Sequence, residues 1–338
     1  MSVFVAEELS EVLNTKVVIG RINMGLLNRI IIDDVLLDDQ SGQEMLKVTR
    51  LSAKFDIMPF FKGKISISSV QLFGFNINLR KETPDSPPNF KFVLDAFASK
   101  DTVKKENSLD LRINSILIRR GRMSYHVLSE EETPGKFNAK HIQLQNIIAN
   151  ISLKALSKDS LNLGIKRLSL DEKASGFSLK KMSLKLVANN KQTNIDNFTI
   201  ELPETSLKLD TIHLEYDSLK AFDRFTEQVH FSFRTLPSQV TLKDISPFVP
   251  ILSHFKEPVT LDMEVKGTVD QLTCSHLEIT ADDRQFRLRG DVSLQDLSRP
   301  QDAYVYGTLS ELSANTRGVG FLVRNLSPNY NGVPPLLE

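Results

Sequence analysis

The chain has 338 residues with 42 basic and 42 acidic side chains, so its formal net charge is zero and no general attraction to nucleic acid is expected. Its one cysteine, Cys274, excludes a framework of intrachain disulfides. The length suits a large core and suggests roughly two domains. No stretch matches the run of about 18 apolar residues that is typical of a transmembrane helix.

Helical patterns are few along the chain. Apolar residues at helical spacing predict short helices at 3–13, 89–99 and 245–255. Asn89 is the expected N-cap of the second helix, and Ser246 with Pro247 suits the start of the third. The polar stretch 100–107 is the expected linker. Three short helices cannot cover the many strands that the remaining patterns predict.

One apolar spacing recurs ten times. Two alternating apolar residues are followed by a two-residue step and two more alternating apolar residues, as in Ile30, Ile32, Val35 and Leu37. These positions scatter around a helical wheel, but in a strand one extra residue in the middle, a bulge or kink, returns the second pair to the face of the first. Other copies begin at residues 17, 46, 65, 111, 137, 163, 193, 207 and 272. The chain is therefore predicted to be a series of bent strands, each apolar on one side.

The predicted fold is mainly β: an elongated, curved antiparallel sheet of repeated hairpins that forms a groove, with a few short helices. Residues 1–104 are expected to form an N-terminal helix and strand unit that includes helix 89–99. Residues 105–338 are expected to form the repeating groove with helix 245–255, and the array is expected to continue beyond residue 338. The alternative is a compact β-sandwich, a binding or adhesion module whose apolar faces are ordinary core.

Catalytic motifs are not found in the sequence, so no enzyme, no cofactor and no metal site is predicted. The six histidines, at 126, 141, 213, 230, 254 and 276, are never three or four residues apart, as a metal-binding helix would need. The segment 38–42 lacks the alternating acids of a calcium loop and is expected to be a hairpin turn. Asp33 and Asp34 are adjacent, so in a strand they face opposite sides and are not an acid/base pair.

Three segments carry a resemblance to a known family. The helix and strand at 5–18, the hairpin IIIDDVLLDDQSGQEMLKVTRLSAKFDI and the pair SVQLFGFNINL and PNFKFVLDAF resemble the N-terminal part of TamB-like proteins of the Bacteroidetes type. The later DISPFVPILSHFKEPVTLDMEVKGTVDQLTCSHLEIT is similar to a recurring element of the same AsmA-like superfamily.

The resemblance implies a location and partners. Such proteins are anchored in the bacterial inner membrane by an N-terminal helix and cross the periplasm as a taco-shaped β-groove. They meet a BamA/TamA-type protein of the outer membrane through a C-terminal region. Their implied roles are phospholipid transport between the two membranes and outer-membrane protein assembly. This chain would then be a periplasmic segment without that anchor helix and C-terminal region.

An apolar groove of this kind would hold phospholipid acyl chains without any catalytic residue. Its lining is expected to come from the apolar side of successive strands. The predicted lining residues are Ile113, Ile116, Ile118, Ile142, Leu144, Ile165, Leu168, Leu170, Ile195, Phe198, Ile200, Leu209, Ile212 and Leu214.

Overall fold

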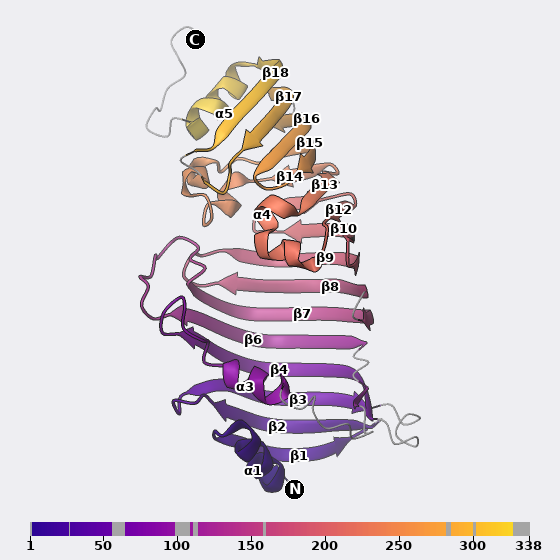
Figure 1. Ribbon diagram of the computed structural model, residues 1–338. Helices are drawn as coiled ribbons and strands as arrows, with labels where there is room; N and C mark the ends of the chain where they lie inside the picture. The colour runs from indigo at the N-terminus through magenta and orange to yellow at the C-terminus, as the bar shows by residue number, and fades with distance from the viewer. Residues whose placement is uncertain are drawn as a thin grey trace. The chain divides into compact units, whose positions relative to one another are not determined.

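The computed structural model describes residues 2–26, 28–55, 65–98, 109–110, 114–157, 160–281, 285–299 and 302–326. The chain is mainly β, as predicted, with mostly antiparallel strands and few helices (Figure 1). It divides into two compact units. Unit 1 comprises Met1–Leu153 and Lys166–Ser178, and unit 2 comprises Lys154–Ile165 and Leu179–Glu338. The predicted boundary at residue 104 lies outside the described ranges and stays a prediction.

Unit 1 is built on one sheet whose strands follow each other nearly in chain order (Figure 1). The strands are β1 (Val17–Gly25), β2 (Arg29–Asp38), β3 (Glu44–Phe55), β4 (Ile65–Lys81), β5 (Leu109–Asp110), β6 (Ser115–Val127), β7 (His141–Ser157) and β8 (Ser160–Glu172), of which β7 and β8 contribute to both units. Strands β1 to β4 pair antiparallel, and so do β6 and β7, but β4 and β6 are parallel. The long connection between β4 and β6 makes this possible, since parallel neighbours need a crossover.

Two of the predicted helices are present in unit 1. Helix α1 (Ser2–Leu13) corresponds to the prediction at 3–13, and α3 (Lys91–Ala98) to the prediction at 89–99. Ser10 fastens α1 to the first strand, because its Oγ accepts a hydrogen bond from the Val17 backbone N–H at 3.0 Å. Ala6 of α1 packs against Val17 and Ile19, and residues around the start of α3 pack on the same cluster.

A line of bends crosses the sheet of unit 1. Asp34, Gly74, Arg120 and Asn146 have left-handed backbone φ angles of 57°, 65°, 55° and 55°. The register places Asp34 opposite Thr49, and Thr49 opposite Gly74, so bends of neighbouring strands coincide. Because Gly, Asn and Asp tolerate this conformation better than other residues, three of the four positions are explained by residue type. The predicted bend of the copy at 30–37 is confirmed at Asp34.

The copy at 65 is confirmed, because the pairing of β4 with β3 shifts register between Ile67 and Ser69. The copy at 111 lies partly outside the described residues and stays a prediction. The copy at 137 is wrong, and further bends that no copy predicted lie at Gly74, Arg120 and Asn146. Phe137 precedes β7 in the hairpin loop and belongs to no strand. In a long strand the second apolar pair of one copy can also be the first pair of another copy, so the same spacing fits at two positions. Spacing alone therefore cannot locate the bend.

Unit 2 is also built of antiparallel strands. At two places a pair of short strands lies beside one long strand. The strands are β9 (Ser178–Asn189), β10 (Gln192–Glu201), β11 (Ser206–Lys208), β12 (Ile212–Glu215), β13 (His230–Arg234), β14 (Ser238–Val240), β15 (Val259–Gly267), β16 (Gln271–Ala281), β17 (Phe286–Gln295) and β18 (Tyr304–Ala314). The short β11 and β12 pair with the two halves of β10, and β14 and β13 pair with the two halves of β15. Bulges predicted for the copies at 193 and 272 are confirmed, with Asn197 and His276 in the left-handed conformation.

The prediction of one helix at 245–255 is wrong. Two 3₁₀ turns, Leu242–Ile245 and Pro250–His254, occupy this stretch. Pro250 explains the interruption, because a residue before proline is pushed out of the helical region, and Val249 has φ −132° and ψ 86°. None of the helices in the described part of the chain has the length and apolarity to cross a bilayer.

Two other helices are not predicted by the sequence patterns: α4 (Phe225–Gln228) and α5 (Thr316–Leu326). Asn315 caps α5, since the Gly318 backbone N–H donates to its Oδ1 at 2.9 Å. Phe321 of α5 packs on Phe286, with ring centroids 5.7 Å apart. Helix α5 thus covers one end of the apolar side of β14 to β17.

Candidate functional site

The line of bends brings five residues of unit 1 together on the apolar side of the sheet. We call them the crease: Val35, Val48, Phe75, Gly121 and Ile147. Val35 faces Val48, Val48 faces Phe75, and Gly121 faces Ile147 in the strand register. Val48, Phe75 and Ile147 are only 4%, 7% and 8% exposed. All three lie on neighbouring strands of one sheet.

Phe75 fits the crease because its neighbour on β6 has no side chain. A Cβ atom added at Gly121 would lie 2.4 Å from the Phe75 ring and 3.0 Å from Ile147 Cβ. The ring therefore occupies the space that any other residue at 121 would fill. The φ angle of Gly121 is not left-handed, so the backbone conformation does not require glycine here. Close packing does.

Partly exposed apolar side chains lie on both sides of the crease. We call them the flanks: Leu46, Leu51, Leu72, Ile77, Ile118, Met123, Leu144 and Leu170. All of them come from strands β3, β4, β6, β7 and β8. A sandwich core would instead draw its members from two facing sheets. Crease and flanks together form the apolar face of unit 1.

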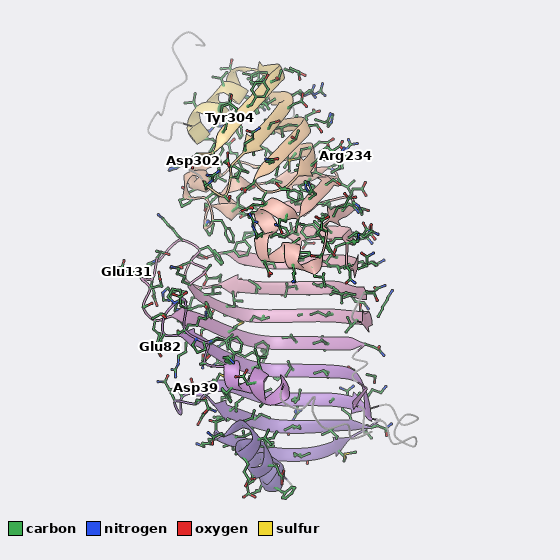
Figure 2. All side chains as sticks on the ribbon, in the orientation of Figure 1. Asp39, Glu82, Glu131, Arg234, Asp302 and Tyr304 are labelled. Atoms are coloured by element: carbon green, nitrogen blue, oxygen red, sulfur yellow. The ribbon has the colours of Figure 1, made fainter. Side chains whose placement is uncertain are left out.

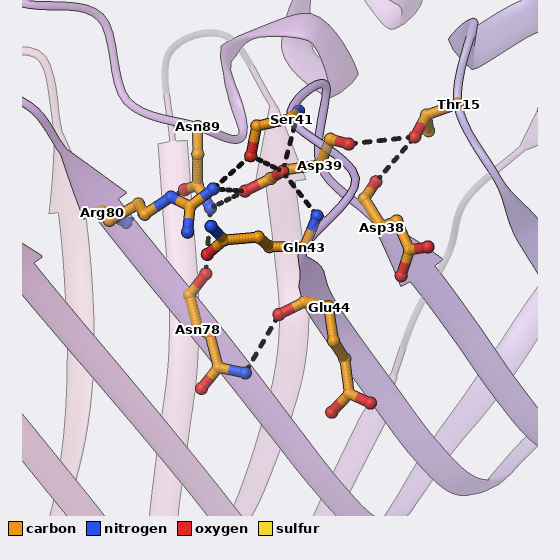
Figure 3. Close-up of polar contacts among 9 residues, drawn as sticks. All are labelled: Thr15, Asp38, Asp39, Ser41, Gln43, Glu44, Asn78, Arg80 and Asn89. Carbon is orange, nitrogen blue, oxygen red and sulfur yellow. Dashed lines mark hydrogen bonds and ion pairs between the residues drawn. The ribbon is translucent and has the colours of Figure 1, made fainter.

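Helices α1 and α3 lie at the β1 to β3 end of this sheet (Figure 1). The turn between β2 and β3, which is the predicted hairpin turn at 38–42, fixes the approach to α3 (Figure 3). Asp39 accepts hydrogen bonds from the Ser41 and Gln43 backbone N–H groups at 2.9 and 3.1 Å. It also pairs with Arg80 at 2.7 Å and accepts from Asn89 Nδ2 at 3.2 Å.

Asn89 is not the N-cap that the sequence predicts. Its Oδ1 accepts from the Arg80 backbone N–H at 3.0 Å, and its Nδ2 donates to the Asn78 backbone oxygen at 3.0 Å and to Asp39. The side chain is thus committed to the end of β4 and to the turn. Asn89 holds the chain that leads into α3 against the sheet.

The Asp39 carboxylate is charged despite being buried. Burial raises the pKa of Asp39, but hydrogen bonds from Ser41, Asn89 and Gln43 outweigh burial and hold this pKa below its ordinary value. Asp33 forms a 2.6 Å ion pair with Arg50, whereas Asp34, its neighbour at the bend, is exposed. The two adjacent acids thus have separate environments.

The predicted lining residues of unit 1 are partly brought together. Ile118, Leu144 and Leu170 are flank residues of the apolar face. Ile116 faces Ile151, and Ile142 faces Tyr125, on the same strands β6 and β7. Leu168 is half-buried on β8, and Ile113 lies outside the described residues.

The remaining predicted residues belong to unit 2: Ile165, Ile195, Phe198, Ile200, Leu209, Ile212 and Leu214. Ile195 faces Ile212, and Leu214 faces Thr193, across the β10 and β12 pair. Phe198 and Leu209 line a cavity of about 490 Å³ whose other walls are mostly polar. Leu209 is buried and the other six are half-buried. A surface continuous between the two units stays a prediction.

Three central residues of the apolar face were missed from the sequence: Phe75, Gly121 and Ile147. Each lies just after a bend, at Gly74, Arg120 or Asn146. The signal was present, because the apolar spacing continues past the copies that were assigned, and two of these bends carry Gly or Asn. Comparisons of the chain with protein-family models, with curated proteins and with solved structures find no match. The resemblance to TamB-like proteins therefore stays a prediction.

Proposed function

We propose that the apolar face of unit 1 binds lipid acyl chains, as part of a groove that carries phospholipid between the inner and outer membranes of a bacterium. The observation that supports this most is the composition of the face: crease and flanks are apolar and lie on one sheet, and the flanks are partly exposed. The periplasmic location, the inner-membrane anchor outside this chain, the BamA/TamA-type partner and a role in outer-membrane protein assembly rest on the family resemblance.

The physical chemistry of this face suits a chain of methylene groups. Each methylene removed from water contributes about 0.8 kcal/mol, whatever the head group. The described flank residues are aliphatic side chains and a methionine, which adapt to a flexible acyl chain without fixing its geometry. The polar cavity of about 660 Å³ in unit 2, lined by Lys191, Glu215 and Asp217 among others, is a poorer fit for such a ligand.

Adjacent residues of β6 provide a matched test of this proposal. Ile118 is a flank residue next to Leu72, whereas Leu117 is equally half-buried but lies between Gln71 and Asn150 on the other side of the sheet. A photoreactive amino acid at 118 should crosslink to phospholipid from phosphatidylethanolamine and phosphatidylglycerol vesicles. The same group at 117 should not. Equal labelling at both positions, or none at 118, contradicts lipid binding by this face.

An acidic side chain at position 118 distinguishes an exposed apolar face from a closed sandwich core. Ile118→Asp should leave the protein folded, because water can reach a half-exposed carboxylate, and should abolish crosslinking from a photoreactive group at 144. In a sandwich core the buried charge costs several kcal/mol and the unit unfolds. Leu117→Asp is the control for a general effect of charge on this strand. Thermal unfolding of Ile118→Asp below room temperature, with no lipid adduct in the parent protein, favours the sandwich.

A further inference from the structure

Two histidines that are far apart in sequence meet at the end of the β6 and β7 hairpin. His126 and His141 are register partners in unit 1. The next pair outward is hydrogen-bonded, since the Val127 backbone N–H donates to the Lys140 oxygen at 2.9 Å. Hydrogen-bonded and non-hydrogen-bonded pairs alternate in antiparallel strands, so His126 and His141 form a narrow pair whose side chains lie close together. Sequence spacing missed them because a hairpin, and not a helix, joins them.

The two rings face each other through the same type of nitrogen. His126 Nδ1 and His141 Nδ1 are 3.0 Å apart. His141 Nε2 lies 2.9 Å from the Glu130 backbone oxygen, which can only accept, so Nε2 carries the proton. In neutral His141 the Nδ1 atom is therefore left with a free lone pair that points at His126. His141 is buried and His126 is half-buried.

A carboxylate completes the cluster. Glu132, in the loop after β6, places a carboxylate oxygen within 4.8 Å of the ligand nitrogens of both histidines. Figure 2 labels the neighbouring Glu131, which marks this loop. Glu130 is already paired with Lys140 at 2.5 Å, and Arg80, the neighbour of His126 on β4, is paired with Asp39. Glu132 is exposed, so a small movement of its side chain brings it to the two nitrogens.

We propose that His126, His141 and Glu132 bind a Zn²⁺ ion, with water at the fourth position. Zn²⁺ takes imidazole nitrogen and carboxylate oxygen at about 2.0–2.2 Å in tetrahedral geometry, which puts two ligand nitrogens roughly 3.3 Å apart. The observed 3.0 Å needs little adjustment. The carbonyl bound to His141 Nε2 supplies the outer hydrogen bond that fixes the tautomer and orientation of metal-bound histidines.

Such an ion would fasten the loop 128–140 to the sheet. That loop already touches the turn after β8, because the Gly135 backbone N–H donates to the Ala174 oxygen at 2.9 Å. Zn²⁺ bound by two strands and the loop stabilises the folded state by an amount that grows with the logarithm of the Zn²⁺ concentration once this exceeds the dissociation constant. The site thus strengthens one end of the hairpin that carries Ile118 and Leu144, and it does not depend on lipid binding.

Titration of the untagged full chain with ZnCl₂ tests the proposal. Calorimetry should show one site, and the melting temperature should rise with added Zn²⁺ but not with Mg²⁺. His126→Ala should abolish both effects, and Glu132→Gln should weaken them. Glu131→Gln and His230→Ala are controls that should bind as the parent does. Zn²⁺ binding that is unchanged in His126→Ala, or missing in the parent, overturns the proposal.

Histidine NMR gives a second readout that does not depend on a variant folding. Nitrogen-15 spectra of the parent protein should show Zn²⁺ on Nδ1 of both rings, with the proton of His141 retained on Nε2. Co²⁺ in place of Zn²⁺ should give the visible absorption of a tetrahedral site. Coordination through Nε2 of His141, or no change in the ring resonances of His126 and His141, contradicts the site.

Discussion

Phe75 and Gly121 show how closely residues of neighbouring strands in one sheet can pack. The bend at Gly74 turns Phe75 toward β6, and the missing side chain at 121 leaves room for its ring. Arg120, also at a bend, is the least expected residue there, because a left-handed backbone costs roughly 1–2 kcal/mol for most side chains. Its guanidinium lies 5.3 Å from the Phe73 ring centroid, a cation–π contact that offsets part of this cost.

Gly121→Ala should therefore destabilise the protein by about 1–3 kcal/mol, because its Cβ would overlap the Phe75 ring and force it to move. Phe75→Leu removes the ring and makes room for the new methyl group. The double variant should then be more stable than the sum of the two single effects predicts. Urea unfolding of the four proteins measures this coupling. Strictly additive effects would mean that the ring and residue 121 are not in contact.

The strands were predictable because each carries its apolar pattern locally, and the existence of bends followed from the same pattern. The spacing located the bends at Asp34, Asn197 and His276, but it did not indicate those at Gly74, Arg120 and Asn146. The wrong helix at 245–255 came from reading apolar spacing without the effect of Pro250 on Val249. Helix α5 was missed because Gly318 and Gly320 count against a helix. In the fold, however, a Cβ at Gly318 would lie 1.9 Å from the Gln285 oxygen, so close packing requires glycine.

The crease and the histidine pair depend on contacts that the sequence does not display. Phe75 meets Gly121 only because β4 and β6 are parallel neighbours, which follows from the path of a long connection. His126 meets His141 through the register of a hairpin with a long loop. Local spacing reports which residues share a face of one strand. It does not report which strand lies next to it.

Asp39, in the turn between β2 and β3, should make the free energy of unfolding depend on pH in the acidic range. The pKa of Asp39 is lowered in the folded state, so its contribution is present above the ordinary pKa, near 4, and is lost as the pH falls through the folded value. Glu172, whose pKa is lowered by bonds from Ser175 and Gln143 despite burial, acts in the same direction.

Asp39→Asn removes one of these two groups. It should lower the free energy of unfolding at pH 7 by about 1.5–3 kcal/mol, the contribution of hydrogen bonds to a charged group. It should also reduce the loss of stability between pH 5 and pH 3 relative to the parent, leaving the part due to the other carboxyl groups whose pKa is lowered, Glu172 among them. Urea midpoints measured across this range test both effects. An acid dependence equal to that of the parent would show that Asp39 is not charged in the folded protein.

The same arrangement recurs in both units of the chain. In unit 2, Val265 and Cys274 are register partners, only 3% and 7% exposed, and Cys274 immediately precedes the bulge at His276. Burial raises the pKa of the Cys274 thiol, as is usual for a cysteine that serves as a small apolar residue. In each unit helices cover one part of the apolar side of the sheet. These helices are α1 and α3 in unit 1 and α5 in unit 2. The described part of each unit thus combines bent strands that are apolar on one side with few helices.

A conduit requires that both units bind lipid, whereas a binding module requires only one. Ile195 on β10 faces Ile212, and the neighbouring Asn194 on the opposite side of the strand faces His213. Photoreactive groups at 118 and 195 should both crosslink to phospholipid from the same vesicles, while groups at 117 and 194 should not. Labelling at 118 alone would support an acyl-chain site in unit 1 and contradict a conduit that involves both units. Labelling from groups at 144 and 195 that is lost together in Ile118→Asp would show that lipid binding in the two units is coupled.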